Sequence, residues 1–235
     1  MTHRAFCSVV LLSAAVSASD MPLAVSDVAT GPRSHVRLTN TAGQPVTAWS
    51  LAAASPSANG GTHREVYTAD GYLSEATHGL PGANDRIERL MPGESRELPL
   101  DPLPPGTTVS VVAAVLDDGT AVGEESAVAS IFARRARERD ALKAVADAFG
   151  EVLPARHGAD ALAALRERFA ALAQRNDAVP CRAALDAVQQ FQKKSSAEDI
   201  DRSLQSYADF VKREYALASK HAQRRTPGPR GPGLQ

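Results

Sequence analysis

Cysteine is scarce in this chain, which contains only Cys7 and Cys181. We expect Cys7 to be removed with an N-terminal signal segment, which leaves a single thiol in the mature protein. An intramolecular disulfide is then excluded, even in an oxidising compartment. Cys181 is either a buried, inert thiol or one half of an intermolecular disulfide, and the first interpretation is favoured.

Long apolar runs are also lacking, apart from one at the N-terminus. The first residues, MTHRAFCSVVLLSAAVSASD, combine a positive start, an apolar run over 5–16 and short side chains around Ala18. This pattern is typical of a signal peptide over 1–18 that is cleaved after Ala18, with a buried N-terminal helix as the alternative. The apolar run is shorter than the roughly 20 residues that span a bilayer. We therefore expect an exported protein, periplasmic or extracellular, without a transmembrane segment in its mature chain.

Common catalytic motifs are missing as well. The sequence contains no G-x-S-x-G, H-E-x-x-H, C-x-x-C or phosphate loop. The histidines do not show the spacing of metal ligands. We therefore predict no catalytic residue, no bound metal and no cofactor. Any enzyme built on this sequence would need polar residues that converge only after folding.

Residues 33–123 show the two-residue alternation and the Gly/Pro turns of short β-strands. The predicted strands are 35–40, 45–53, 64–69, 94–100 and 107–116. The last of them is apolar on both faces, which favours a central position, and 70–92 is expected to be a long surface loop. Trp49 is expected in the core. The pattern indicates a small antiparallel β-sandwich or a half-barrel.

From Glu124 onwards, apolar residues recur at the helical period of about 3.6. Four helices are predicted within 124–222: one that stops at Gly150, one around 162–172, one that begins near Asp177, and one that runs from Ser195 to about His221 with Ser195-x-x-Glu198 as a capping box. Short connections favour an antiparallel bundle, and the tail 223–235 is expected to be disordered. The fold class is thus predicted to be α+β, a small antiparallel β-sandwich followed by a bundle of about four helices.

The stretch VLDDGTAVGEES, 115–126, places four carboxylates close together at the junction of the two regions. An EF-hand calcium loop would need ligands at alternate positions, whereas Asp117 and Asp118 are adjacent and point to opposite sides of an extended chain. Asp118-Gly119 after an apolar strand is instead typical of a tight turn. Glu124 and Glu125 then suit the positive end of a following helix. We predict a structural junction rather than an ion site.

Charge is unevenly distributed along the chain. Residues 19–123 carry six arginines and twelve acids, a net charge of −6, whereas 212–235 carry a net charge of +5. The basic residues of this C-terminal cluster either solubilise a helix end or contact an anionic envelope surface such as lipid or polymer. They are Lys212, Arg213, Lys220, Arg224, Arg225 and Arg230.

The stretch ARRARERD, 133–140, resembles a nucleic-acid-binding stripe, but its arginines alternate with Glu138 and Asp140. Opposite charges at helical spacing support one another, and an exported chain is not expected to meet nucleic acid. Two interpretations remain open for these arginines. They form a solvated face, or they pack their stems against the β-region and pair with its acids.

Two tyrosines, Tyr67 and Tyr72, flank Asp70-Gly71, and we consider these residues as a ligand-binding rim. The alternative function, an unrecognised envelope enzyme such as a hydrolase, would require a deep pocket that gathers polar residues of this region. The candidates for such a pocket are His63, Glu65, Tyr67, Asp70 and His78.

Three segments resemble a pattern found in uncharacterised exported bacterial proteins, in which a strand runs into D-G-T, a glycine and then a helix. They are VSVVAAVLDDGTAVGEESAVASIFARRARERDAL (109–142), VRLTNTAGQPVTAW (36–49) and RLMPGESRELPL (89–100). The resemblance implies an exported protein with a β-module and helices, and it brings no activity, cofactor or catalytic residue with it. We therefore expect a non-catalytic binding or scaffolding protein whose partner is an anionic envelope component or another envelope protein.

Overall fold

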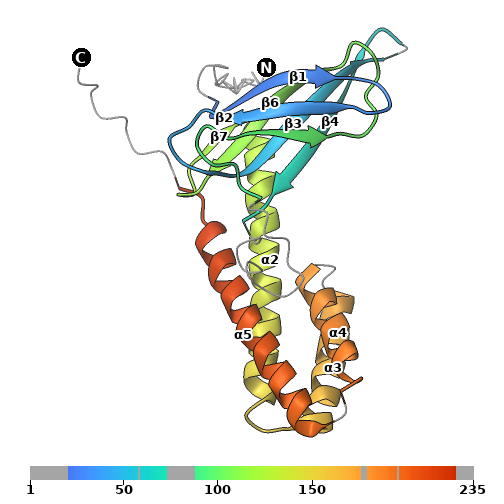
Figure 1. The fold of residues 1–235 in the computed structure, drawn as a ribbon, viewed down its shortest axis with the longest axis vertical. Coiled ribbons are helices and arrows are strands. Elements are labelled where there is room, and N and C mark those ends of the chain that lie inside the picture. The colour runs from blue at the N-terminus through green and yellow to red at the C-terminus, as the bar shows by residue number, and fades with distance from the viewer. Residues whose placement is uncertain (1–20, 58, 73–87, 176–178, 195, 226–235) are drawn as a thin grey trace, which may run out of the picture.

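The computed structural model describes residues 21–57, 59–72, 88–175, 179–194 and 196–225. These residues form two antiparallel sheets and four helices, arranged as a β-sandwich from which a helical bundle extends (Figure 1). The α+β prediction is confirmed. The proposed signal peptide, Ser195 and most of the expected tail lie outside the described residues.

The three-stranded sheet has the order β1-β2-β5 and the four-stranded sheet the order β4-β3-β6-β7. The strands of the first sheet are β1 (Leu23–Ala29), β2 (His35–Asn40) and β5 (Ser95–Pro99). Those of the second are β4 (Thr62–Asp70), β3 (Val46–Pro56), β6 (Thr108–Leu116) and β7 (Ala121–Gly123).

The five predicted strands are confirmed to within three residues at their ends, and β6 has strands on both sides, as expected. Two strands were missed. β1 is irregular, with a register shift between Ser26 and Ala29 that interrupts its alternation. β7 has only three residues, and pairing with β6 rather than local propensity makes it a strand.

The space between the two sheets holds the core of the sandwich. Its buried members come from both inner faces and include Leu38, Trp49, Leu51 and Leu90. Trp49 is 4% exposed, which confirms its expected place in the core. Burial of a large apolar side chain contributes about 1.5–3 kcal/mol, so these residues hold the two sheets together.

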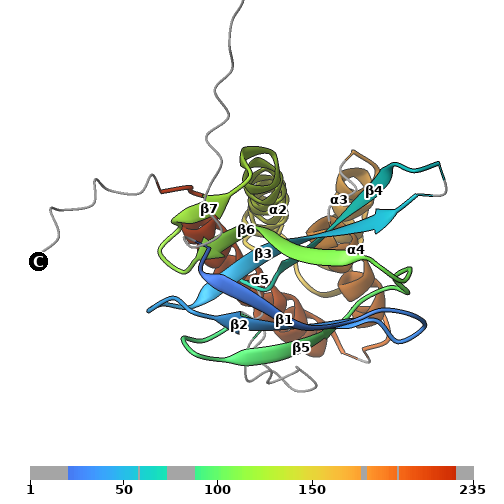
Figure 2. The same cartoon turned by 90° about the horizontal axis from the view of Figure 1, so that it is seen from above.

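The outer face of the four-stranded sheet is covered by α2 (Glu125–Val152). Seen from above, this sheet lies between the three-stranded sheet and α2 (Figure 2). Ala48 and Ala113 on the sheet are small enough to let the helix approach, and they meet Val128 and Ile131. The alternation of β3 and β6 therefore serves two cores, one on each face.

The junction at 117–119 is a hairpin turn, as predicted. The N–H of Gly119 donates to the carbonyl of Leu116 at 3.0 Å, and the Asp118 carboxylate accepts the N–H of Thr120 at 2.9 Å. Among the turn residues only Gly119 has a positive φ, of 86°. β7 intervenes between the turn and the helix.

Four helices form the bundle, as predicted: the C-terminal part of α2, α3 (Gly158–Arg175), α4 (Val179–Phe191) and α5 (Ala197–His221). Gly150 does not stop the first helix, which continues to Val152. The cap of α5 is Ser196, whose hydroxyl accepts the N–H of Asp199 at 3.1 Å, one residue later than expected.

The bundle core is rich in aromatic contacts. Phe149 of α2 meets Phe169 of α3 and Tyr207 of α5 edge to face, at centroid distances of 5.1 and 5.9 Å. Cys181 is fully buried in the same core, and burial raises the pKa of its thiol. The expected buried thiol is thus confirmed, and an intermolecular disulfide would require local opening of α4.

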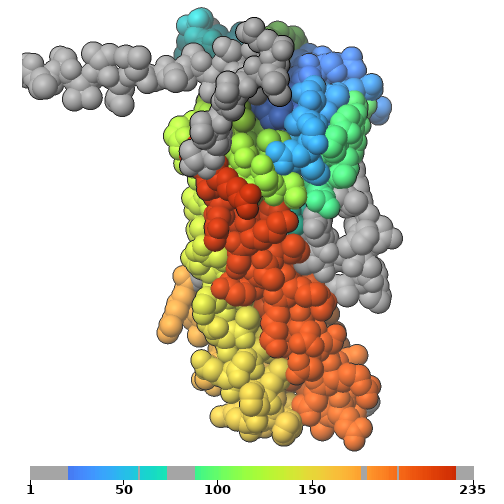
Figure 3. Space-filling model, turned by 90° about the vertical axis from the view of Figure 1, so that its left-hand side faces the viewer, coloured from blue at the N-terminus to red at the C-terminus, as the bar shows by residue number. Residues whose placement is uncertain are grey.

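The sandwich and the bundle share α2. A helix of 28 residues is about 42 Å long. Its first turns cover the four-stranded sheet and its last turns lie in the bundle, while α5 runs back beside it towards the sandwich (Figure 3). The molecule is therefore elongated, with a rigid helical link rather than a linker between its two parts.

Candidate functional site

The three residues considered as a rim do not form one. Tyr67 is partly exposed on β4, whereas the side chain of Asp70 has no exposed surface and Tyr72 is 1% exposed. Asp70 ends β4 on the face that is turned towards α2, opposite to the face of Tyr67. Tyr72 is buried while Tyr67 is partly exposed, so the two tyrosines do not line one surface. The rim prediction was wrong for Asp70 and Tyr72.

Asp70 instead forms the centre of a buried joint with α2. The guanidinium of Arg135 donates to both carboxylate oxygens of Asp70 at 2.8 Å, to the Thr47 hydroxyl at 3.0 Å and to the His221 carbonyl at 3.1 Å. It also lies 4.8 Å from the centre of the Tyr72 ring. Burial raises the pKa of Asp70, and the two hydrogen bonds from Arg135 oppose this rise.

This joint selects between the two interpretations of the arginine stretch. Arg135 packs against the β-region and pairs with one of its acids, as one interpretation proposed. Arg134 pairs with Glu138 four residues later, and Arg139 pairs with its neighbour Asp140 near the surface. The stretch is therefore an interface at one residue and a partly solvated face at the others, and the joint is structural.

The same region contains a carboxyl group with an altered pKa. Burial, and then the negative charge of Glu138, raise the pKa of Glu214 from 4.5 to about 7. Glu214 therefore binds a proton more tightly in the folded chain than in the unfolded one. Its contribution to stability is present below pH 4.5 and is lost as the pH rises through 7.

Between pH 5 and pH 8 the wild type should lose about 2 kcal/mol of unfolding free energy that Glu214→Gln keeps. The measurement is urea unfolding at both pH values. His221 also makes the stability of the wild type depend on pH. Burial and Arg135 lower its pKa to about 4, so its contribution to stability rises with pH, whereas that of Glu214 falls. Because both proteins contain His221, the difference between them isolates Glu214. An equal gap at the two pH values would contradict this expectation.

The described part of the β-region contains a groove between β4 and β5, of about 420 Å³, which we call the edge groove. Its apolar surface comes from both sheets, with Trp49 and Leu51 of β3 on one side. The remaining lining residues are Tyr67, Thr68, Ala69, Leu98, Pro99, Leu100 and Asp101.

Polar groups gather at the mouth of the edge groove. The Tyr67 hydroxyl donates to the Glu65 carboxylate at 2.8 Å. Burial raises the pKa of Tyr67 to about 12, with further contributions from Glu65 and Asp101. The phenol therefore stays neutral and acts as a hydrogen-bond donor rather than as a base. The carboxylates of Glu65 and Asp101 make the mouth acidic.

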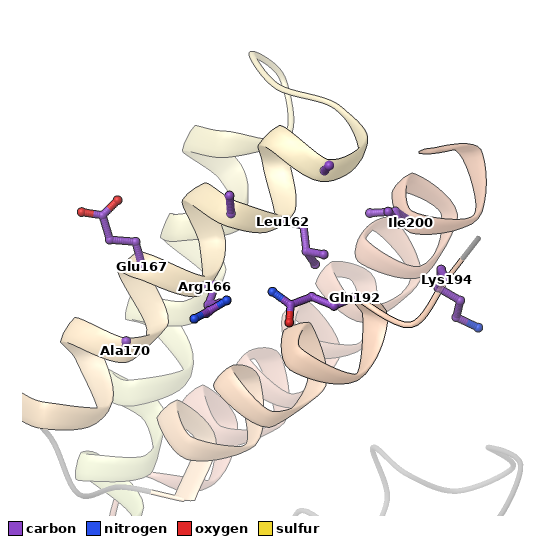
Figure 4. Close-up of a pocket in the computed structure, with 9 residues that line it drawn as sticks. Leu162, Arg166, Glu167, Ala170, Gln192, Lys194 and Ile200 are labelled. Carbon is purple, nitrogen blue, oxygen red and sulfur yellow. The ribbon is translucent and has the colours of Figure 1, made fainter. Parts of the chain in front are cut away.

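A second groove of about 710 Å³ lies in the bundle, between α3, the chain after α4 and the start of α5 (Figure 4). Leu162, Arg166 and Gln192 lie along it, whereas Glu167 and Lys194 point outwards at its sides. Its charged groups therefore do not converge on one point. This groove is larger than the edge groove, but its lining contains no aromatic side chain, whereas the edge groove is lined by Trp49 and Tyr67.

The end of the C-terminal basic cluster is held by the chain itself. Arg224 donates two hydrogen bonds to Glu125, at 2.6 and 2.9 Å. The backbone N–H of Arg225 donates to the Gly119 carbonyl at 2.9 Å, so the first residues of the expected tail are ordered against the hairpin. Arg230 lies outside the described residues.

The lysines of the cluster are also close to acids. Lys212 lies 3.7 Å from Asp209, and Lys220 lies 4.0 Å from Asp117. Arg213 is exposed. With three of its cations facing carboxylates of the same chain, the cluster has less charge to offer an anionic surface than the sequence suggested.

Other candidate residues do not converge. His63 and Glu65 are exposed on β4, Asp70 is held by Arg135, and His78 lies outside the described residues. Within the described ranges, histidine, cysteine and carboxylate side chains do not gather in a group that would hold a metal ion. Among the same residues, no helix has both the length and the apolar character needed to cross a bilayer.

The resemblance to exported bacterial proteins stays a prediction, and the geometry described above is the basis for any functional assignment. The chain matches no protein-family model, no curated protein and no solved structure.

Proposed function

We propose that this chain is an exported, non-catalytic binding protein of the cell envelope and that it holds its ligand in the edge groove. One observation carries the proposal: an apolar groove lies open between the two sheets, with aromatic side chains in its wall and acidic groups at its mouth. Binding sites in proteins are typically concave and apolar, with a few polar groups that orient the ligand.

The helical bundle fits a scaffolding role in this proposal. The bundle extends from the side of the four-stranded sheet that faces away from the three-stranded sheet, and the buried pair of Arg135 and Asp70 fixes the helix on which it stands. A rigid link of this kind holds the edge groove at a set distance from whatever the bundle contacts. The enzyme alternative has no comparable support, because Asp70 is separated from His63 and Glu65.

The proposal is tested by placing a photo-crosslinking phenylalanine derivative at position 98 in the groove wall and, as a matched control, at position 179. Leu98 lines the groove, whereas Val179 is 66% exposed at the start of α4. After irradiation in cells of the native host, we expect an adduct from position 98 that is missing from position 179. In Ala69→Phe, which fills the groove, the yield should fall at least about fivefold.

Two outcomes would contradict the proposal. Equal adducts at both positions, or none at position 98, would remove the edge groove as the binding site. The proposed export is tested on the same samples by determining the N-terminus, because the mature protein should begin at Ser19. An intact N-terminus on an intracellular protein would overturn the proposed export and leave the proposed binding site unaffected.

A further inference from the structure

Two sheets have four edge strands, and three of these edges are protected against pairing with another chain. β1 carries a register shift between Ser26 and Ala29, with Asp27 at a φ of 49°. β5 has five residues and contains Pro99, which has no N–H to donate. β7 has three residues, and Arg225 forms a bridge beside it. Short length, bulges and proline are the usual means of protecting an edge.

The fourth edge, β4, lacks these protections. It pairs with β3 over nine consecutive residue pairs without a shift, and its sequence THREVYTAD contains neither proline nor lysine. The N–H of Gly71 donates to the Thr47 carbonyl at 3.1 Å. Because hydrogen-bonded residues alternate in an antiparallel pair, the backbone N–H and C=O groups of Ala69 and Tyr67 also point towards β3. Thr68 and Val66 then direct their backbone groups outwards. No described strand pairs with this outer side.

The edge groove lies beside this open edge. A strand added to β4 would run about 4.8 Å from it, and every second side chain of that strand would turn towards the three-stranded sheet. Those side chains would enter the apolar space between Tyr67 and Ala69 on one side and Leu98 and Leu100 on the other. Glu65 and Asp101 lie at the mouth of the groove, and among the described residues neither carboxylate forms an ion pair with a cation.

We propose that the partner of this protein is an extended peptide segment, with apolar residues at alternate positions and basic residues at its ends, that adds to β4 as a further strand. Backbone hydrogen bonds to β4 would supply affinity, while the groove and its acidic mouth would select the side chains. This inference rests on the proposed function and specifies its ligand. A second copy of the chain is the competing occupant, and the test includes it.

The test uses an acetylated, amidated peptide that alternates Thr with Val or Leu and has Lys at both ends. A control peptide has the same side chains but N-methylated backbone amides, which cannot pair with a strand. Trp49, the only tryptophan, lies in the groove wall and reports binding by fluorescence. Amide hydrogen exchange at Val66 and Thr68 reports pairing with the outer edge.

We expect the first peptide to bind, to slow exchange at both amides and to shift the Trp49 emission, and the N-methylated peptide to bind at least about tenfold more weakly. Val66→Pro removes one outward N–H without touching the bonds to β3, and it should weaken the first peptide about tenfold or more. Val66→Ala keeps that N–H and should bind like the wild type. Circular dichroism of both variants confirms that they fold.

Three results would overturn strand addition. If both peptides bound equally and amide exchange at Val66 and Thr68 were unchanged, the groove would bind the peptide side chains without strand pairing. The proposed function would then still stand. If neither peptide bound, a peptide ligand would be excluded. The proposed function would still be tested independently by the crosslinking at position 98. A dimer in the absence of peptide that Val66→Pro dissociates would assign the edge to a second copy of the chain.

Discussion

Asp70→Asn should lower the free energy of unfolding by about 3–5 kcal/mol. The substitution keeps the shape of the side chain but leaves the Arg135 guanidinium buried without a counter-charge, since neither side chain has exposed surface. A buried, uncompensated cation is far more costly than the pair itself is stabilising. Urea unfolding at pH 7, followed by fluorescence and circular dichroism, measures the loss.

Asp147→Asn is the matched control for this result. Asp147 pairs with Lys143 at 2.7 Å in the same helix, but both side chains are 56% exposed. Exposed pairs contribute little, so we expect a loss of less than about 0.5 kcal/mol. The double variant Asp70→Leu, Arg135→Met removes both charges and should lie closer to the wild type than Asp70→Asn does. Similar losses in Asp70→Asn and Asp147→Asn would show that the joint does not hold the two parts together.

Gly123→Ala should cost about 3 kcal/mol of stability, because the chain turns from β7 into α2 at this residue. Gly123 has a φ of 129°, a conformation that residues with a side chain rarely adopt. An added Cβ would lie 2.2 Å from the Val112 carbonyl oxygen and 2.6 Å from the Ala113 Cα. Backbone atoms in a paired strand cannot move aside as a side chain would. Thermal and urea unfolding of the variant measure the effect.

Glycine to alanine should have the opposite effect on stability at Gly150. This glycine lies inside α2, and an added Cβ would meet open space. Alanine stabilises a helix interior by about 0.5–1 kcal/mol relative to glycine. If Gly123→Ala proved as harmless as Gly150→Ala, the close approach of the Gly123 backbone to β6 would be wrong.

Part of the joint was within reach of sequence analysis. Arg135 falls on the same helical stripe as Val128, Ile131 and Leu142, all of which are buried. A cation on the apolar stripe of a helix indicates a buried acidic partner, so for Arg135 the stripe favours the interpretation in which the arginines pair with acids of the β-region. The identity of the partner was not predictable, because 65 residues separate Asp70 from Arg135 and only the packing of α2 on the sheet brings them together.

The edge groove was less accessible to prediction. Tyr67 was singled out as a rim residue for the turn that follows it, yet its position depends on which face of β4 it occupies. Successive side chains of a strand point to opposite faces, and Tyr67 and Asp70 are three positions apart, so their side chains lie on opposite faces of β4. The opposite wall comes from β5, and its place in the other sheet follows from strand order rather than from any local pattern.

Period and turn chemistry by themselves determined five of the strands (β2 to β6), the four helices and the turn at Gly119, because these features depend on neighbours in the chain. Tertiary structure alone decided that β7 exists, that Asp70 is a buried partner rather than a rim residue, and that β4 is left as an unprotected edge beside a groove. Each of these depends on which distant segments pack together, and burial and pairing energies between such segments outweigh local preference.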